Sequence, residues 1–266
     1  MKQATQISFT LLLFLTATIL HAQPWMQVQQ LVASERAKHD AFGMSVDISD
    51  NYAICGSYLE DEDAAGMLTQ RDAGAAYIFE KDKAEKWTEM QKLVASDRKP
   101  GDHFGVAVAI SGEYAMVGAP DAKNETLYGG KVYVFKRNPV GLWVQHQIIL
   151  LDEQQRDDHF GLVIDMDGDR AVISAFTYQS FETGQNSGAV YVYEVASDGN
   201  WVQKQKLIPP TCGKPPLLFG GAVALSGNHI MIKAFWRSES GSAIDEQVMQ
   251  GIVFAYKKNS NGTWDH

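Results

Sequence analysis

The sequence predicts an all-β fold, a β-propeller built of four-stranded antiparallel blades. Three observations indicate this fold. A Trp followed four residues later by a Gln recurs at intervals of 62, 56 and 58 residues, at Trp25, Trp87, Trp143 and Trp201. Each interval carries a Phe-Gly pair and a closing Gly-x-x-aromatic-x-aromatic run. Each interval also holds four strand-like runs, and repeats of this length with four strands apiece are typical of propeller blades.

The first strand of each repeat opens on the Phe-Gly pair, at Phe42, Phe104, Phe160 and Phe219. Small and branched residues alternate after it, as in Val106 to Ile110, and this alternation predicts a strand. A polar turn such as Ser111-Gly112 follows and predicts a hairpin, because Gly and Asn tolerate the positive φ of tight turns. Alternate positions are small in two repeats, so we place this strand innermost, where the blades converge.

Two further apolar runs predict the second and third strands. The second strand begins at Tyr52, Tyr114, Arg170 and His229. A polar loop that differs between repeats separates it from the third strand, which is apolar on both faces, as in Gly130 to Phe135. A strand of this kind is covered by neighbouring sheets on both sides. In a propeller those sheets are the adjacent blades.

The fourth strand begins at the repeated Trp and is expected at the outer edge of the blade. Period-2 alternation places Trp87, Gln91 and Leu93, at spacing 0, 4 and 6, on one face of this strand. The large aromatic residue is repeated in every blade, so we expect it to pack between blades.

Acidic and imidazole side chains recur just before the Phe-Gly pair. Asp40, Asp102 and Asp158 lie two residues before the Phe, and His103 and His159 directly precede it. A catalytic group is needed once, whereas a scaffold group is needed in every blade. We therefore expect these side chains to cap backbone groups of the turn rather than to catalyse.

The motifs of repeat 2 resemble those of a known family. Phe104-Gly105, Gly118-Ala119-Pro120 and the run Gly130 to Phe135 are similar to the FG-GAP repeat of integrin α-subunit propellers and of many secreted bacterial proteins. The resemblance covers roughly Trp25 to Trp264. It implies a non-catalytic adhesion or binding module.

Two acidic segments are candidates for calcium. Integrin-like members often carry an Asp-x-Asp-x-Asp-Gly loop, and the nearest match is Asp165 to Asp169. When the repeats are aligned on their Phe-Gly pairs, this segment occupies the end of the first strand and the tight turn after it, with no inserted residues. A turn of this length cannot supply the about six to eight oxygens that calcium takes, so we predict a plain turn. The second segment, in the first variable loop, is either a calcium site or a run of solvated acids. It consists of Glu60, Asp61, Glu62 and Asp63.

Counting blades leaves two arrangements open. If blades begin at the Phe-Gly strand, the fourth has only three strands before Trp264. The segment Trp25 to Ala33 can supply its outer strand and close a four-blade ring without exposed sheet edges. Alternatively, the chain is a truncated larger propeller, and Thr263-Trp264 begins another outer strand.

The N-terminus predicts export. Lys2 precedes an apolar stretch from Ile7 to Leu20, and His21-Ala22-Gln23 fits a cleavage site. A stretch of 14 residues is short for a membrane span. We therefore expect a signal peptide at residues 1–22 and a secreted, cell-surface or periplasmic FG-GAP domain at residues 23–266.

Composition narrows the partners. The formal net charge of −9 disfavours nucleic acid, and no later segment is long enough to span a membrane. The two cysteines, Cys55 and Cys212, exclude a disulfide-dense scaffold, and the sequence does not fix whether they pair.

The loops between the second and third strands differ most between repeats, and such loops carry binding residues. Aromatic residues stand at their entrances, where they either form a platform for a sugar or peptide or pack between blades. These residues are Tyr58, Phe176, Phe235 and Trp236. The sequence holds no catalytic, phosphate-binding or Cys-His motif, so we expect no cofactor and no catalysis. The predicted function is a binding module for a protein or glycan ligand. The alternative is a glycan-acting propeller enzyme, sialidase- or lyase-like, with its site in these loops.

Overall fold

The computed structural model describes residues 26–35, 37–123, 127–153, 157–177, 187–209, 218–237 and 249–266, with only the backbone given for residues 236, 237, 249 and 250. The chain divides into two compact units, Met1–Gln30 and Leu31–His266. The described part of the first unit, Met26–Gln30, contains no helix or strand. The described residues of the second unit form sixteen strands and no helix. The predicted signal peptide lies outside the described residues.

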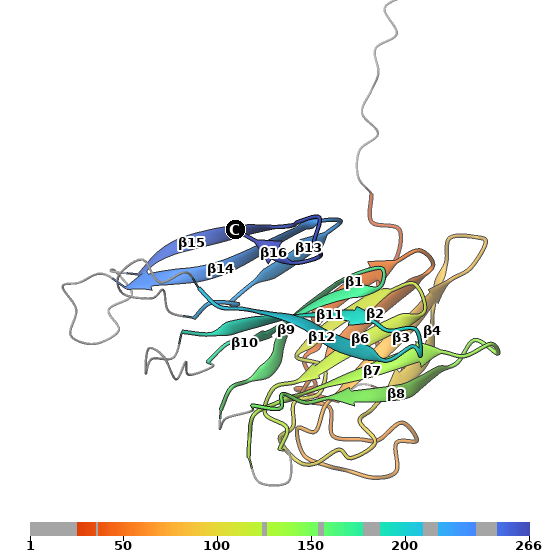
Figure 1. The fold of residues 1–266 in the computed structure, drawn as a ribbon. Helices are drawn as coiled ribbons and strands as arrows, with labels where there is room; N and C mark the ends of the chain where they lie inside the picture. The colour runs from red at the N-terminus through yellow and green to blue at the C-terminus, as the bar shows by residue number, and fades with distance from the viewer. Residues whose placement is uncertain are drawn as a thin grey trace, which may run out of the picture. The chain divides into compact units, whose positions relative to one another are not determined.

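The strands form four antiparallel four-stranded sheets, numbered here as blades 1 to 4, and each sheet follows chain order (Figure 1). Blade 1 comprises β1 (Phe42–Ser49), β2 (Tyr52–Ser57), β3 (Ala75–Lys81) and β4 (Trp87–Leu93). Blade 2 comprises β5 (Ala107–Ser111), β6 (Tyr114–Ala119), β7 (Lys131–Arg137) and β8 (Trp143–Ile149). Blade 3 comprises β9 (Phe160–Asp167), β10 (Arg170–Ala175), β11 (Ala189–Val195) and β12 (Trp201–Leu207). Blade 4 comprises β13 (Val223–Ser226), β14 (His229–Arg237), β15 (Met249–Lys258) and β16 (Trp264–Asp265). The predicted all-β propeller fold is confirmed.

The third strands are buried on both faces, as their apolar pattern predicts. In β7, Tyr133 packs in an apolar cluster with residues of blade 1, whereas its neighbour Val134 packs in a cluster with residues of blade 3. Trp143 lies in the first of these clusters and is 2% exposed, so the predicted inter-blade packing of this Trp is confirmed. Its indole packs edge-on against Tyr52 of blade 1, with 5.7 Å between ring centroids.

A β-bulge separates the Trp from the Gln in the outer strands of blades 1 to 3. In blade 2, Val134 pairs with Gln147 and Phe135 pairs with Gln145, so the intervening residue of β8 has no partner. The extra residue reverses the alternation of faces. Trp143 therefore packs toward blade 1 while Ile149 packs toward blade 3. Our prediction that Trp, Gln and the branched residue share one face was wrong, because period-2 alternation holds only along an unbulged strand.

The bulge brings each Gln to the Trp of the next blade. The Nε2 of Gln147 donates to the carbonyl oxygen of Trp201 at 3.0 Å, and the backbone N–H of Trp201 donates to Oε1 of Gln147 at 2.8 Å. The same pair of bonds joins Gln91 to Trp143 and Gln205 to Trp264. The repeated Trp and Gln are thus the two halves of a clasp between consecutive blades.

The acidic residues Asp165 and Asp167 join inner strands. Asp165 lies in β9 and Asp167 at the following turn, where Gly168 has a φ of 62°, as predicted. The Oδ2 atom of Asp165 accepts the N–H of Leu225 at 2.6 Å, and Oδ2 of Asp167 accepts the N–H of Gly227 at 2.5 Å. Burial raises the pKa of Asp165. These carboxylates therefore bind the backbone of blade 4.

Blade 4 takes its outer strand from Trp264–Asp265, which pairs with Lys257 and Lys258 of β15. The segment proposed for this position, Trp25 to Ala33, forms no strand in its described part. Leu31 and Ala33 instead pack against the face of blade 1 that carries Tyr77. The assignment of Trp25 to Ala33 as the outer strand of blade 4 was therefore wrong, because the strand at Trp264 already holds that edge.

The predicted core cysteine, Cys55, is a buried free thiol in β2. Burial raises its pKa to about 11, which keeps the thiol protonated and unreactive. Cys212 lies outside the described residues.

Candidate binding site

The acidic run of the first variable loop begins with a residue of the scaffold. Glu60 is 1% exposed, accepts a bond from the Tyr77 hydroxyl at 2.9 Å and pairs with the Lys92 ammonium at 3.2 Å. Burial favours the neutral acid, but hydrogen bonds from Glu62, Tyr77 and Lys92 outweigh it and lower the pKa of Glu60. Blades 2 and 3 repeat the arrangement of a Tyr hydroxyl, a carboxylate and a Lys, which indicates a structural role. The repeats are Tyr133, Asp97 and Lys131 in blade 2, and Tyr191, Glu153 and Lys206 in blade 3.

The remaining acids of this run serve the loop itself. The Oδ1 of Asp61 accepts the N–H of Asp72 at 2.7 Å, and the Oδ1 of Asp63 accepts the N–H groups of Ala65 and Met67 at 3.0 and 2.9 Å. The hydrogen bond to Glu60 raises the pKa of Glu62. Within the described part of the chain, no three His, Cys, Asp or Glu side chains are grouped so that they could hold a metal ion.

The aromatic residues at the loop entrances have separate surroundings. Tyr58 packs edge-on against His103, with 5.6 Å between ring centroids. Phe176 is half-buried and lies over Gly221 of blade 4, where an added Cβ would be 3.1 Å from the ring. Phe235 lies under the ammonium of Lys233, 4.6 Å from the ring centroid. Trp236 is paired through its backbone with Gln250 in β14 and β15, and its side chain is not described. The ring contacts described for these residues join none of them to another.

A carboxylate held between two imidazoles lies at the same end of the blades. Nδ1 of His103 is 2.6 Å from Oδ2 of Asp121, and Nε2 of His159 is 3.4 Å from Oδ1 of the same carboxylate. Asp121 directly follows the Gly-Ala-Pro segment at the end of β6, while each His directly precedes the Phe of a Phe-Gly pair, which lies shortly before β5 in blade 2 and begins β9 in blade 3. Both His residues have positive φ, 54° and 50°. The tight turn before Phe-Gly thus aims both rings at the loop that follows β6.

The cluster is polar and partly open to solvent. The side chains of His103, Asp121 and His159 are 29%, 38% and 35% exposed. The hydrogen bonds from His103 and His159 lower the pKa of Asp121 far below its ordinary value, and the bond to Asp121 raises the pKa of both histidines. The hydroxyl oxygen of Thr177 lies 2.9 Å from Nδ1 of His159 and extends the cluster. Its chemistry, a fixed carboxylate with imidazole and hydroxyl groups, suits a ligand rich in hydroxyl or amide groups.

Sequence reasoning assigned these histidines to backbone capping and missed Asp121. The Asp residues before them do cap, since Oδ2 of Asp102 accepts the N–H of Lys99 at 2.8 Å. One signal was present in the sequence. The His before Phe-Gly occurs only in repeats 2 and 3, and the Asp after Gly-Ala-Pro only in repeat 2, so neither is present in every repeat as a scaffold residue would be.

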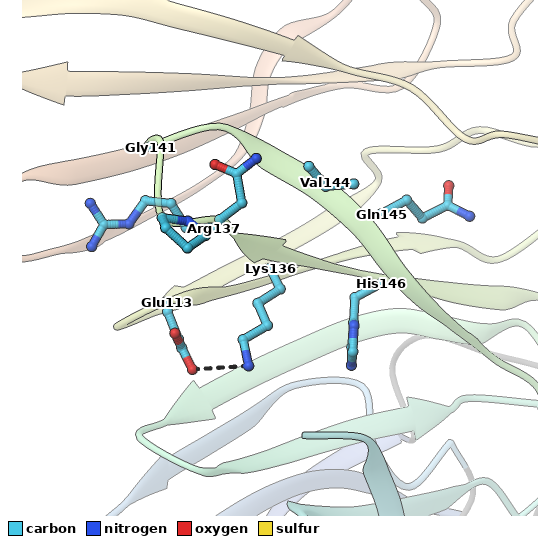
Figure 2. Close-up of a pocket in the computed structure, with 9 residues that line it drawn as sticks. Glu113, Lys136, Arg137, Gly141, Val144, Gln145 and His146 are labelled. Atoms are coloured by element: carbon cyan, nitrogen blue, oxygen red, sulfur yellow. Dashed lines mark ion pairs between the residues drawn. The ribbon is translucent and has the colours of Figure 1, made fainter. Parts of the chain in front are cut away.

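An open hollow of about 730 Å³ lies at the opposite end of blade 2, beside the β7–β8 turn. Its lining side chains diverge: Lys136 pairs with Glu113, and His146 extends to the same side, while Arg137 points away (Figure 2). The guanidinium of Arg137 instead donates to the Tyr52 hydroxyl of blade 1 at 2.6 Å. A similar hollow occupies the equivalent place in blade 1. Its repetition indicates a feature of the scaffold, so the His–Asp–His cluster is the stronger candidate.

Comparison with known families decides what kind of repeat this is. The FG-GAP repeat matches residues 25–79, 87–135 and 143–193, together more than half of the chain. The chain belongs to the FG-GAP repeat family. Glycine positions of the FG-GAP motif meet between blades, because a Cβ on Gly118 would lie 1.9 Å from the carbonyl oxygen of Gly161, and one on Gly56 would lie 2.0 Å from that of Gly105. Only Gly permits this approach of two backbones.

Solved structures with a similar arrangement include two bacterial proteins. A protein from Lactobacillus plantarum is 14% identical with a TM-score of 0.41, and the match covers 80% of this chain and 63% of that chain. The periplasmic gluconolactonase of Pseudomonas aeruginosa is 12% identical with a TM-score of 0.37, and the match covers 84% of this chain and 70% of that chain. No curated protein matches the FG-GAP chain. No helix in its described residues is long and apolar enough to cross a membrane.

Proposed function

We propose that this protein is a non-catalytic, exported binding module that takes a protein or glycan ligand at the His103–Asp121–His159 cluster. One observation carries the proposal. The cluster joins loops of blades 2 and 3 around one carboxylate, and this arrangement occurs once among the described residues, whereas the clasps and the Tyr–carboxylate–Lys sets recur. Groups that do not recur serve purposes other than the repeated scaffold, and variable loops over a rigid scaffold are common binding sites.

The surroundings of the cluster favour a polar ligand with some apolar surface. Tyr58 offers a half-buried ring beside His103, and Thr177 offers a hydroxyl beside His159. An aromatic face next to a few fixed hydrogen-bonding groups is an arrangement that binds sugars and amide-bearing peptides. The apolar stretch Ile7 to Leu20 supports export of the protein. An exported protein meets the sugars and peptides that cell surfaces present.

Binding can be tested with the exported form, residues 23–266, on a glycan array and by pulldown of cell-surface proteins. We expect Asp121→Asn to weaken binding at least about tenfold, equivalent to about 1.4 kcal/mol. Asp50→Asn is a matched control, because Asp50 is an exposed residue of the β1–β2 turn with a φ of 53° that Asn tolerates. Binding that is equally strong in both variants would show that the ligand site lies elsewhere.

A second candidate function, a glycan-acting enzyme, is favoured by one feature of the same cluster. His103 is hydrogen-bonded to a carboxylate that raises its pKa, and a positioned His–Asp pair can transfer protons. Turnover assays on any glycan that binds distinguish the two functions. Saturable binding without turnover supports the binding module, and turnover that His103→Gln abolishes supports the enzyme.

A further inference from the structure

Two sheet faces of this chain are apolar and exposed. On β1 of blade 1, Met44, Val46 and Ile48 point to one side and are 67%, 66% and 62% exposed. On blade 4, Met231 of β14 and Val253 of β15 are 55% and 61% exposed. A blade buries both faces in a stack, so each of these faces lacks a neighbour.

The buried interface between blades 2 and 3 shows what these faces match. Counting from the Phe-Gly pair, Val46 and Ile48 of blade 1 correspond to Ile164 and Met166 of blade 3. Ile164 and Met166 are 8% and 7% exposed, because they pack in one cluster with Met116 and Val132 of blade 2. By the same alignment, Met116 and Val132 correspond to Met231 and Val253 of blade 4. The two uncovered faces thus carry the side-chain types of the two halves of an existing interface.

Hydrogen bonds between the inner strands also match blade 4 to blade 1. Asp47 of blade 1 and Asp165 of blade 3 each bind a backbone N–H of the following blade, whereas blades 2 and 4 carry Ala109 and Ala224 at this position. Blade 3, which follows an Ala, satisfies its N–H of Met166 with its own Asp165 at 2.9 Å.

Blade 1 does the same, since the N–H of Ile48 is held by its own Asp47 at 2.8 Å. Blade 1 is therefore built to follow a blade with Ala at this position, and blade 4 is such a blade. Blade 4 also carries the hydroxyl group that blade 2 uses to bind blade 3. Ser111 of blade 2 accepts the N–H of Gly168 at 2.9 Å, and Ser226 is its counterpart in blade 4.

The outer part of blade 1 already receives a segment as it would from a preceding blade. The N–H of Ser34 donates to the carboxylate of Glu89 at 2.7 Å, and its hydroxyl donates to the same group at 2.6 Å. Between blades 1 and 2, Ser96 and Gln145 form the equivalent pair of bonds. Among the described residues of this face, those of β1 stay uncovered.

We propose that blade 4 of one copy of this chain docks on blade 1 of a second copy, and that the contact repeats the interface between blades 2 and 3. Both faces are exposed within the same chain, so the covering blade comes from another molecule. Two copies joined in this way at both ends close a ring of eight blades, within the size range of about four to eight blades found in propellers.

Light scattering after size exclusion tests this proposal on residues 23–266 under reducing conditions, across a dilution series. We expect the wild type to have twice the mass of one chain. Ile48→Glu and Val253→Lys should each give a monomer, since each places a charge in both contacts of the dimer. Val144→Lys, at an exposed apolar residue of β8, is the control and should stay dimeric.

Mixing the two monomeric variants separates a second copy from closure within one chain. In the mixed dimer, one contact is wild type and the other pairs the introduced carboxylate of one variant with the introduced ammonium of the other, so the doubled mass should return on mixing. A wild type that is monomeric at all concentrations overturns the proposal. Loss of folding stability in both single variants without any change in mass also overturns it, and indicates instead that blades 4 and 1 meet within one chain.

Discussion

The clasp between Gln147 and Trp201 allows the role of the repeated Trp and Gln to be measured. Replacing Gln147 with Leu preserves side-chain size and removes both hydrogen bonds to the backbone of Trp201, at 3.0 and 2.8 Å. Each such bond contributes about 1 kcal/mol net. Because Gln147 is half-buried, water replaces only part of the loss, and we expect the free energy of unfolding to fall by about 2 kcal/mol.

Urea denaturation of residues 23–266, followed by tryptophan fluorescence, gives the measurement. With a slope of about 2 kcal/mol per molar urea, the loss moves the midpoint by about 1 M. The control is Gln203→Leu, an exposed position in the next outer strand. Gln147→Glu retains the acceptor for the Trp201 N–H but lacks the donor for its carbonyl, so it should cost less. It should also recover as the new carboxyl protonates near its ordinary value of about 4.3.

If Gln147→Leu and Gln203→Leu both unfold at the same urea concentration as the wild type, the Gln147 amide does not link the blades. That result would mean that the repeated spacing of Trp and Gln reflects the packing of the strands and not the hydrogen bonds of the Gln. A loss confined to Gln147→Leu would establish that the side-chain amide links the blades.

Four further measurements follow from the same structure. Trp143→Ala should lower the free energy of unfolding by about 3–5 kcal/mol in urea melts, because the indole is 2% exposed between two blades. Gly118→Ala should abolish folding or cost several kcal/mol in circular dichroism melts, about the scale of a severe steric clash, because its added Cβ would lie 1.9 Å from the carbonyl oxygen of Gly161. Asp121→Asn should lower the free energy of unfolding more at about pH 5.5 than at about pH 9. Asp121 raises the pKa of both histidines, so the stability that their charged forms contribute is complete below the ordinary value of about 6.5 and is lost as pH rises through the raised values. Asp121 itself stays charged at both pH values because its pKa is lowered. Melting temperatures in EDTA and in calcium should coincide, since Asp61 and Asp63 bind N–H groups of the loop itself and Glu60 binds Lys92. A large rise in melting temperature with calcium would contradict this view.

Strand positions were predictable because they depend on local pattern and turn chemistry. The second strands of all four blades begin at the predicted Tyr52, Tyr114, Arg170 and His229, and the outer strands of all four begin at a Trp. Period-2 alternation and a polar two-residue turn suffice to define a hairpin. The same local logic predicted a tight turn at Asp167-Gly168, and Gly168 lies there with a φ of 62°.

Contacts between blades were less predictable, because they join residues far apart in the sequence. The clasp from Gln91 to Trp143 spans 52 residues, and the bond from Asp47 to Ile110 spans 63. The clasp does not follow from the sequence alone, since a single bulge in β4 decides which face Gln91 occupies. The bond from Asp47 depends on which blade packs beside blade 1. The candidate site has the same property: Asp121 and His159 lie 38 residues apart and meet only because consecutive blades stack.

Sequence pattern alone was enough to predict the repeat, the order of the four strands in each blade, the turns and the identity of the buried Trp. Tertiary structure decided the direction of the Gln clasp, the choice of Trp264 as the outer strand of blade 4, the pairing of His103 and His159 with Asp121, and the scaffold role of Glu60. The physical reason is that alternation and turn propensity act within a few residues of the chain, whereas register, bulges and the neutralisation of buried charges are fixed only when one blade packs against the next.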